Sequence, residues 1–141
     1  MKIKGETGCT DVKGADRIEI VYFTDPLCCW SWALEPHWRK FLDHYQHLIS
    51  WRYCMGVMIP DWNSFSDPLN DISRPAQMGP LWMQVKHTTG AEIDANLWME
   101  DPPESSFAPC LAVKCAALQS PAAEDVLLTL LRKAVMTQRK I

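Results

Sequence analysis

The stretch "RIEIVYFTDPLCCWSWALEP", residues 17–36, decides the fold. Its first part, "RIEIVYF" (17–23), alternates and is rich in β-branched and aromatic residues, which predicts a strand. "DPLC" then forms a turn, and residues 28 to about 48 have helical periodicity, with Pro36 expected to kink or split the helix. "LISWRYCMG" (48–56) predicts a second strand. Strand, helix and strand in this order predict a parallel pair with a right-handed crossover.

Beyond the second strand the sequence predicts helices and no third strand. Residues 57–75 are rich in Pro, Asp, Asn and Ser and predict a long loop. Residues 76–90 predict a helix that breaks near Gly79 and Pro80 and ends at Gly90. The next stretch, "AEIDANLWMEDPP", predicts irregular structure. Two further helices are expected after it, the first capped by Ser105 or Ser106 and the second by Ser120 with Pro121 in its first turn.

Length and composition place the chain among compact domains. It has 141 residues, of which 48% are hydrophobic, and a net charge of -3. Without clustered Lys and Arg it is not expected to bind nucleic acid, and its apolar runs are too short for a membrane span of about 20 residues. The N-terminus has no apolar core typical of a secretory signal, so we expect a cytoplasmic protein. We predict a flexible leader (1–16), a β-α-β unit (17–56) and a mostly helical domain (57–141).

Six cysteines are spread unevenly over the chain. Their distribution and an adequate core favour free thiols in a reducing compartment over a disulfide framework. Cys54, Cys110 and Cys115 lie among apolar residues, so we interpret them as small buried hydrophobic side chains. Cys9 lies in the leader. The six are Cys9, Cys28, Cys29, Cys54, Cys110 and Cys115.

Cys28 stands where the predicted helix begins. The first N–H groups of a helix are unpaired and the helix dipole is positive there, so both favour the thiolate, the nucleophile of disulfide exchange, over the thiol. Pro26 helps to fix the helix entry, and Asp25 is a candidate cap. The other interpretation of a cysteine at this position is simple packing.

The position that a second redox cysteine would occupy is a serine. A dithiol site needs C-x-x-C, because one helical turn brings the two sulfurs together, and here the four residues are Cys28, Cys29, Trp30 and Ser31. The Ser31 hydroxyl can donate a hydrogen bond to a Cys28 thiolate, but it cannot form a disulfide. A bond between Cys28 and Cys29 would close a strained eight-membered ring.

The segment "FTDPLCCWSWALEPHWRK" resembles the active-site segment of the DsbA-like branch of the thioredoxin superfamily, in particular its cytoplasmic FrnE-type dithiol–disulfide isomerases and SpxH-type adaptors. Their pattern is roughly D-P-x-C-x-W-C-W-x-x-E-P, and Ser31 departs from it. The similarity continues through "GVMIPDW", "ISRPAQMGPLWM" and "LWMEDPPESSFAPCLAVKCAALQ". The matching residues are Asp25, Pro26, Cys28, Trp30, Trp32, Glu35 and Pro36.

The resemblance implies an α/β, thioredoxin-like β-α-β unit followed by a helical insertion domain. It also implies a later β-β-α half, with a cis-proline facing the cysteine, and none of this half is found in the sequence. The expectation is therefore that the chain is a fragment of a longer protein or that a second copy completes the sheet.

The resemblance implies that Cys28 attacks a substrate disulfide and that an outside thiol such as glutathione releases the product. Ser31 would act with Cys28, while Asp25, Pro26, Cys29, Trp30 and Glu35 would support the site. Glu35 is either a buried acid that transfers protons near the sulfur or a packing residue. Trp30 and Trp32 either shape access to the sulfur or pack.

Other patterns give weaker signals. His44 and His47 are three apart on the predicted helix, but without a third ligand they do not predict a metal site, and we expect none. No bound cofactor is expected, although glutathione can serve as a co-substrate. Trp62, Trp82 and Trp98 lie in or beside loops and either line a peptide groove or fill the core.

The leading hypothesis is a DsbA-like thiol–disulfide oxidoreductase or isomerase that acts through one cysteine on protein or peptide thiols and disulfides. One alternative is a redox-inactive adaptor of the same fold. Another is a glutathione-using transferase or isomerase relative. The sequence does not distinguish oxidant, reductant and isomerase.

Overall fold

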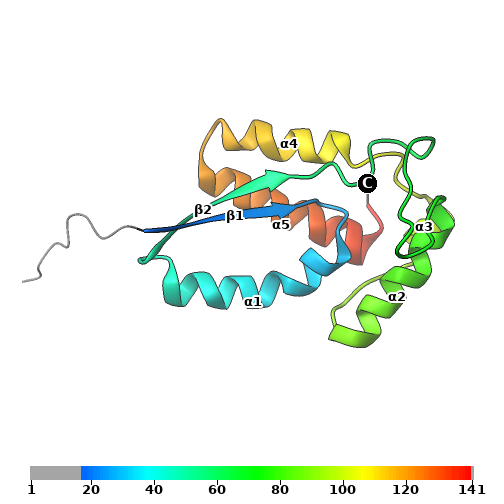
Figure 1. Ribbon diagram of the computed structural model, residues 1–141, viewed down its shortest axis with the longest axis horizontal. Coiled ribbons are helices and arrows are strands. Elements are labelled where there is room, and N and C mark those ends of the chain that lie inside the picture. The colour runs from blue at the N-terminus through cyan, green and yellow to red at the C-terminus, as the bar shows by residue number, and fades with distance from the viewer. Residues whose placement is uncertain (1–16, 141) are drawn as a thin grey trace, which may run out of the picture.

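The computed structural model describes residues 17–140, and its first third is the predicted β-α-β unit (Figure 1). Strand β1 (Ile18–Thr24), helix α1 (Cys29–Tyr45) and strand β2 (Ile49–Met55) follow one another. The strands pair in parallel, from Ile18 opposite Ile49 to Thr24 opposite Met55. The predicted order and direction are confirmed. The predicted leader, residues 1–16, lies outside the described residues.

Helix α1 is continuous, so the expectation that Pro36 splits it is wrong. Pro36 lies inside the helix, which runs without interruption from Cys29 to Tyr45. Residues on both sides of the proline are buried, Cys29 before it and Trp38 and Leu42 after it. Burial of both halves against the rest of the molecule compensates for the one backbone hydrogen bond that a proline removes.

Helices fill the second half of the described chain. The break expected at Gly79 and Pro80 does not occur, because both residues lie in the first turn of α2, where a missing N–H costs nothing. Gly90 ends α2 in the left-handed conformation, at φ 73°, as predicted. The stretch expected to be irregular contains the short helix α3. The elements are the 3-10 turn η1 (Pro75–Gln77), α2 (Met78–Thr89), α3 (Leu97–Glu100), α4 (Phe107–Ala117) and α5 (Pro121–Gln138).

The predicted caps of the last two helices are confirmed in position. Ser106 is the N-cap residue of α4, and the Ser105 hydroxyl accepts a hydrogen bond from the Phe107 N–H at 3.0 Å. The Ser120 hydroxyl caps α5 by accepting from the Ala123 N–H at 3.0 Å, with Pro121 at the first helical position. Each hydroxyl pairs with a backbone N–H near a helix start that would otherwise have no partner.

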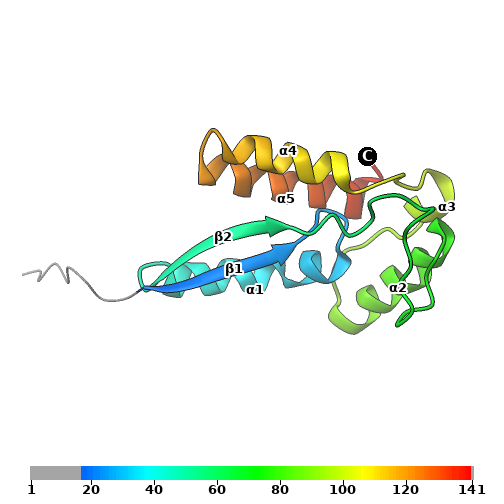
Figure 2. The same cartoon turned by 45° about the horizontal axis from the view of Figure 1, so that its top comes forward.

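The helices cover one face of the two-stranded sheet. In Figures 1 and 2, α1 runs along one side of the strand pair and α4 along the other, with α5 between them. Alternate strand residues point toward these helices and pack with α1, α4 and α5. They are Ile20 and Tyr22 of β1 and Trp51, Tyr53 and Met55 of β2.

The opposite face of the sheet, which we call the open sheet face, belongs to none of the core clusters of the described chain. Phe23 on this face is 71% exposed. Arg52 and Glu19 form an exposed salt bridge there, with 3.3 Å between Nε and Oε1. The open sheet face consists of Glu19, Val21, Phe23, Ser50, Arg52 and Cys54.

The largest core cluster lies beyond the sheet, between the loop that follows β2 and helices α2, α3 and α5. Trp82 and Trp98 are 0% and 1% exposed and meet at right angles, with ring centroids 5.2 Å apart. The alternative that these two tryptophans line a peptide groove is therefore wrong. Trp62 packs against Trp98 at the edge of the same cluster.

Candidate functional site

Cys28 lies at the start of α1, as the sequence predicts. It is the N-cap residue, with extended backbone geometry, and its carbonyl accepts the first helical hydrogen bond from the Trp32 N–H at 3.1 Å. Its own N–H donates to the Asp25 carbonyl at 3.1 Å, which closes a tight turn between β1 and α1. The side chain is half-buried and its thiol is free. The residue therefore stands at the helix end whose first N–H groups are unpaired, its side chain makes no capping hydrogen bond to them, and it keeps access to solvent.

Cys29 has the opposite environment. It is 3% exposed and belongs to the main core cluster. Burial raises the pKa of its thiol to about 12, and the neighbouring Cys28 adds to this effect. Because its thiolate is scarcely populated at neutral pH, Cys29 is a poor nucleophile and a poor substitute for the missing second cysteine of a dithiol site.

Asp25 is buried but does not cap α1, so this expectation is wrong. One carboxylate oxygen accepts from the Leu27 N–H at 2.8 Å, before the helix begins. The other accepts from the Met58 N–H at 2.7 Å and from the Cys110 thiol at 3.3 Å. Asp25 thus joins the turn that carries Cys28 to the loop after β2 and to α4. Pro26 beside it is buried as well.

The hydrogen bond of the Ser31 hydroxyl is to the end of β1 and not to Cys28. It accepts a hydrogen bond from Thr24 Oγ1 at 2.9 Å, and both side chains are buried. The hydrogen bonds of residues 17–140 include none between Ser31 and Cys28. The role of Ser31 as a donor to the Cys28 thiolate stays a prediction.

Glu35 accepts hydrogen bonds from four donor atoms and lies in a buried network between α1 and α5. Arg39 donates to its Oε1 from Nε at 3.0 Å and from Nη2 at 2.6 Å, and Thr129 donates to the same oxygen at 2.9 Å. Arg132 donates from Nη1 to Oε2 at 2.6 Å. Arg39 continues the network to Asp125, and Asp125 accepts from the Tyr53 hydroxyl. These contacts favour a structural role for Glu35.

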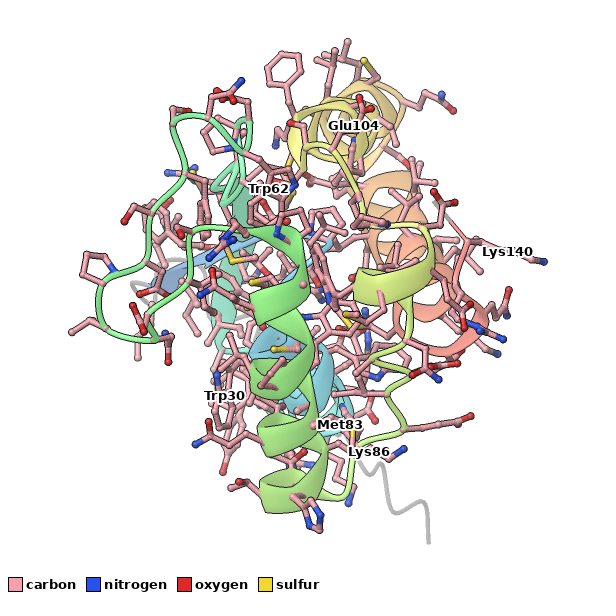
Figure 3. All side chains as sticks on the ribbon, turned by 90° about the vertical axis from the view of Figure 1, so that its right-hand side faces the viewer. Trp30, Trp62, Met83, Lys86, Glu104 and Lys140 are labelled. Carbon is pink, nitrogen blue, oxygen red and sulfur yellow. The ribbon has the colours of Figure 1, made fainter. Side chains whose placement is uncertain are left out.

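Trp30 lies at the surface next to α2, as Figure 3 shows, and is 48% exposed. It lines a shallow groove of about 440 Å³ together with Ala33, Leu34, His37 and Thr89. Trp32 is half-buried, and its indole donates to the Glu92 carbonyl at 2.9 Å. Trp30 is therefore available to a ligand, whereas Trp32 connects α1 to the segment after α2.

Three residues next to the predicted site carry no motif of their own. Thr24 ends β1, Cys110 lies in α4 and Arg132 lies in α5. A signal for Arg132 was present, because an arginine inside the apolar run "VLLTLLRKAVM" must find a buried partner. Thr24 and Cys110 could not be singled out, since only the fold brings them to Ser31 and Asp25.

Disulfides, metal clusters and membrane spans are not found in the described part of the chain. The five cysteines within residues 17–140 are free thiols. Of the three expected to be buried among apolar residues, Cys110 is buried and Cys54 is half-buried, but Cys115 is exposed, so that interpretation is wrong for Cys115. In the same range no three side chains of His, Cys, Asp or Glu gather as metal ligands. No described helix has the length and apolar character that crossing a bilayer requires.

Comparison with known families gives one match over most of the chain. The family model Thioredoxin_5, described as thioredoxin, matches residues 22–141. This range includes Cys28, Ser31 and all the helices of the second half.

Curated relatives are similar to the chain over part of their own length. The ClpXP adapter protein SpxH of Halalkalibacterium halodurans is 31% identical over 123 residues, which is 87% of this chain and 40% of that protein. SpxH of Bacillus subtilis is 26% identical over 125 residues, with the same two shares. The chain spans about two fifths of the length of these relatives.

Solved structures share the fold. A candidate protein disulfide isomerase from Nitrosomonas europaea superposes with a TM-score of 0.70 at 19% identity, over 89% of this chain and 58% of that one. The cytosolic disulfide reductase DsbM from Pseudomonas aeruginosa gives 0.65 at 16% identity, over 87% and 57%. A further structure of DsbM contains glutathione and gives 0.61 at 17% identity. At these identities the likeness is one of fold.

Proposed function

This chain belongs to the thioredoxin family, and from that premise we propose that it carries the cysteine half of a thiol–disulfide exchange site, with Cys28 as the nucleophile. The predicted thioredoxin-like α/β fold with added helices and the resemblance to DsbA-like proteins are both confirmed. The position of Cys28 supports the proposal most directly: a free, half-buried thiol at the first turn of the helix that follows β1.

The proposed reaction is an exchange of sulfur–sulfur bonds. The Cys28 thiolate attacks one sulfur of a substrate disulfide, a Cys28–substrate bond forms, and the other substrate sulfur leaves as a thiolate. A second thiol then attacks the mixed disulfide and releases Cys28 as a thiolate. If that thiol belongs to the substrate, the cycle is an isomerisation without net redox change. If two glutathione molecules supply the thiols, the substrate is reduced and glutathione disulfide is formed.

Ser31 shapes this proposal, because it stands where a second cysteine would complete the reaction within the chain. Cys29 is adjacent, but its thiol is buried and its pKa is raised to about 12. Release of the mixed disulfide therefore depends on an external thiol. Glutathione is the proposed co-substrate, since the glutathione-containing structure of DsbM has the same fold.

The experiment compares three cysteine-to-alanine variants in a mixed-disulfide assay with glutathione disulfide, followed by intact mass spectrometry. We expect Cys28→Ala to lower the rate of adduct formation on the order of tenfold or more. The matched controls are Cys29→Ala, a buried thiol, and Cys115→Ala, an exposed thiol outside the site; both should still form the adduct at Cys28. A Cys28→Ala chain that exchanges as fast as the parent chain contradicts the proposal.

A second candidate function is that of an adaptor that needs no redox cycle. The observation that favours it is the similarity to SpxH, described as a ClpXP adapter, together with the serine at position 31. An adaptor presents a surface, so Cys28→Ala should leave partner binding unchanged. Binding of a candidate partner that is lost in Cys28→Ala but not in Cys115→Ala favours the exchange reaction.

The proposed partners are protein or peptide thiols and disulfides, or glutathione, with the cytoplasm as the proposed compartment. We also propose that a second copy of the chain can pack on the open sheet face. The exposed Phe23 supports this, since an apolar side chain of that size gains free energy when it is covered.

A further inference from the structure

Arg132 of α5 extends from the buried network to the turn that carries Cys28. Its side chain is 0% exposed, and its guanidinium makes two contacts through different nitrogens. Nη1 donates to Glu35 Oε2, and Nη2 donates to Thr24 Oγ1. The guanidinium also lies over the Tyr22 ring, 5.9 Å from its centroid. Arg132 is therefore held in one position by β1 and α1.

The direction of the first bond follows from the chemistry of the guanidinium, and the direction of the second is that of the contact between Thr24 and Ser31. A guanidinium can only donate, so Thr24 Oγ1 is the acceptor of the bond from Arg132. A threonine hydroxyl has one hydrogen, and that hydrogen is directed to Ser31 Oγ at 2.9 Å. Ser31 is consequently the acceptor in its contact with Thr24, and its own hydrogen is not used there.

The Ser31 hydrogen has no acceptor among the hydrogen bonds of the described residues. Thr89 and Thr137 each donate to the carbonyl four residues earlier in their helices, at 2.7 and 2.8 Å, but Ser31 makes no such bond. Cys28 is the N-cap residue of α1 and Ser31 is its third helical residue, and side chains at these two positions lie near each other at a helix start. The acceptor that this geometry offers to the Ser31 hydrogen is the Cys28 sulfur when it is ionised.

We propose that Arg132 and Thr24 are positioning residues for the Cys28 site: Arg132 holds the Thr24 hydroxyl, Thr24 donates its one hydrogen to Ser31, and the Ser31 hydrogen is left to be donated to the Cys28 thiolate. The inference rests on the proposed function, because it concerns the ionised sulfur that performs the exchange. It assigns a role to Ser31 that differs from that of a resolving cysteine. In this role the serine stabilises the attacking thiolate.

The positive charge of Arg132 does not by itself explain such an effect. Glu35 neutralises the guanidinium at 2.6 Å, and Arg39 and Thr129 satisfy the other Glu35 oxygen. The field of this pair at the sulfur is therefore that of a dipole and falls off faster than that of a single charge. The hydrogen bonds from Arg132 to Thr24 and from Thr24 to Ser31 connect the network to Ser31 directly.

The test measures the midpoint pH of Cys28 alkylation by iodoacetamide, resolved by peptide mass spectrometry. Thr24→Val removes the donor to Ser31 and should raise the midpoint by about half to one pH unit, which is about a three- to tenfold loss of rate below the midpoint. Thr24→Ser keeps the hydroxyl and should restore the parent midpoint. Thr129→Val is the matched control, because it removes a hydroxyl from the Glu35 network without contact to Ser31.

The same measurement in a Ser31→Ala chain isolates the proposed path. Ser31→Ala alone should raise the midpoint by a similar amount, and Thr24→Val added to it should have no further effect. An unchanged midpoint in Ser31→Ala overturns the inference, even if Thr24→Val fails to fold. Equal shifts from Thr24→Val in the two backgrounds overturn it as well.

Failure of this inference is distinguishable from failure of the proposed function. If Cys28 exchanges with glutathione disulfide but the Thr24 and Ser31 substitutions leave its alkylation midpoint unchanged, the proposed function holds and the positioning role is wrong. If the midpoint shifts as expected but Cys28 does not exchange with any disulfide, the positioning role holds and the exchange reaction is wrong.

Discussion

Two adjacent cysteines differ more in environment than any sequence pattern indicates. Cys28 precedes the first helical residue and is half-buried, whereas Cys29 is directed into the main core cluster. One residue of the helix changes the direction of a side chain by about 100°, so neighbours at a helix start can face solvent and core. This contrast supports the first sulfur of the pair, rather than the second, as the proposed nucleophile.

Glu35 and Arg132 form a buried ion pair, and we predict that removing the charge of Glu35 destabilises the folded chain. Glu35→Gln leaves the fully buried Arg132 guanidinium without its charge partner, so we expect a loss of about 3–5 kcal/mol in the free energy of unfolding, measured by urea denaturation. The matched control is Glu19→Gln, which removes an exposed salt bridge to Arg52. That change should stay within about 0.5 kcal/mol. Equal effects of the two substitutions would contradict the assignment of Glu35 to a buried network.

At the scale of single elements, the hydroxyl of Ser120 determines where α5 starts. Ser120→Ala removes the hydrogen bond to the Ala123 N–H and leaves that donor without a protein partner. We expect a loss of about 1 kcal/mol in the free energy of unfolding. Ser66→Ala, in an exposed loop position, serves as the control and should have no measurable effect. A stability for Ser120→Ala that matches the control would show that α5 does not depend on this cap.

The helices and strands were largely predictable because their signals are local. Alternation identified β1 and β2, and Ser120, Pro121 and Gly90 marked helix ends through their own backbone and capping chemistry. Of the two outcomes expected at Pro36, a kink or a split, the split does not occur, because burial on both sides of the proline stabilises one continuous helix. The expectation that Asp25 caps α1 was wrong because its partners are distant in sequence: its carboxylate accepts hydrogen bonds from the Met58 N–H and the Cys110 thiol.

The candidate site was predictable only in part for the same reason. The position of Cys28 at a helix start follows from residues 17–36 alone. The contact of Thr24 with Ser31, and of Arg132 with both Thr24 and Glu35, requires α5 to pack beside α1. No periodicity or spacing in a single sequence specifies which face of a late helix meets an early one. The division into units 17–56 and 57–141 stays a prediction.

At the scale of the whole molecule, two buried thiols and one buried phenol predict a loss of stability at alkaline pH. Burial raises the pKa of Cys29 and of Cys110 from 9.0 to about 12, with Asp25 adding to the shift of Cys110. Burial also raises the pKa of Tyr53, and its hydrogen bond to Asp125 adds to this. Because the folded chain holds these protons more tightly than the unfolded chain, the stabilisation is complete below pH about 9 and is lost as the pH rises toward 12.

Urea unfolding at about pH 8 and about pH 11 measures this loss, which we expect to be about 1–2 kcal/mol for each thiol. Cys110→Ala should reduce the difference between the two pH values, whereas Cys115→Ala, at an exposed position, should leave it unchanged. A free energy of unfolding that stays constant over this range contradicts the burial of the two thiols.

The open sheet face predicts self-association of the chain at high concentration. Phe23 exposes 71% of its surface on a face that no described helix covers. In sedimentation velocity the parent chain should form dimers as the concentration rises, and Phe23→Glu should shift it toward the monomer. Leu69→Glu is the control, because Leu69 is 96% exposed but lies outside the sheet. A dimer that persists in Phe23→Glu and dissociates in Leu69→Glu places the interface elsewhere.

The burial of Cys29 beside Cys28 has a consequence for oxidative damage. Peroxide converts a thiolate to a sulfenic acid, which is rescued when a nearby thiolate condenses with it. The neighbouring Cys29 is buried, with its pKa raised to about 12, so it supplies almost no thiolate for that rescue. A sulfenic acid at Cys28 therefore either meets a small thiol from solution or proceeds to the irreversible sulfinic acid. The lifetime of the protein under peroxide is set by the thiol concentration around it.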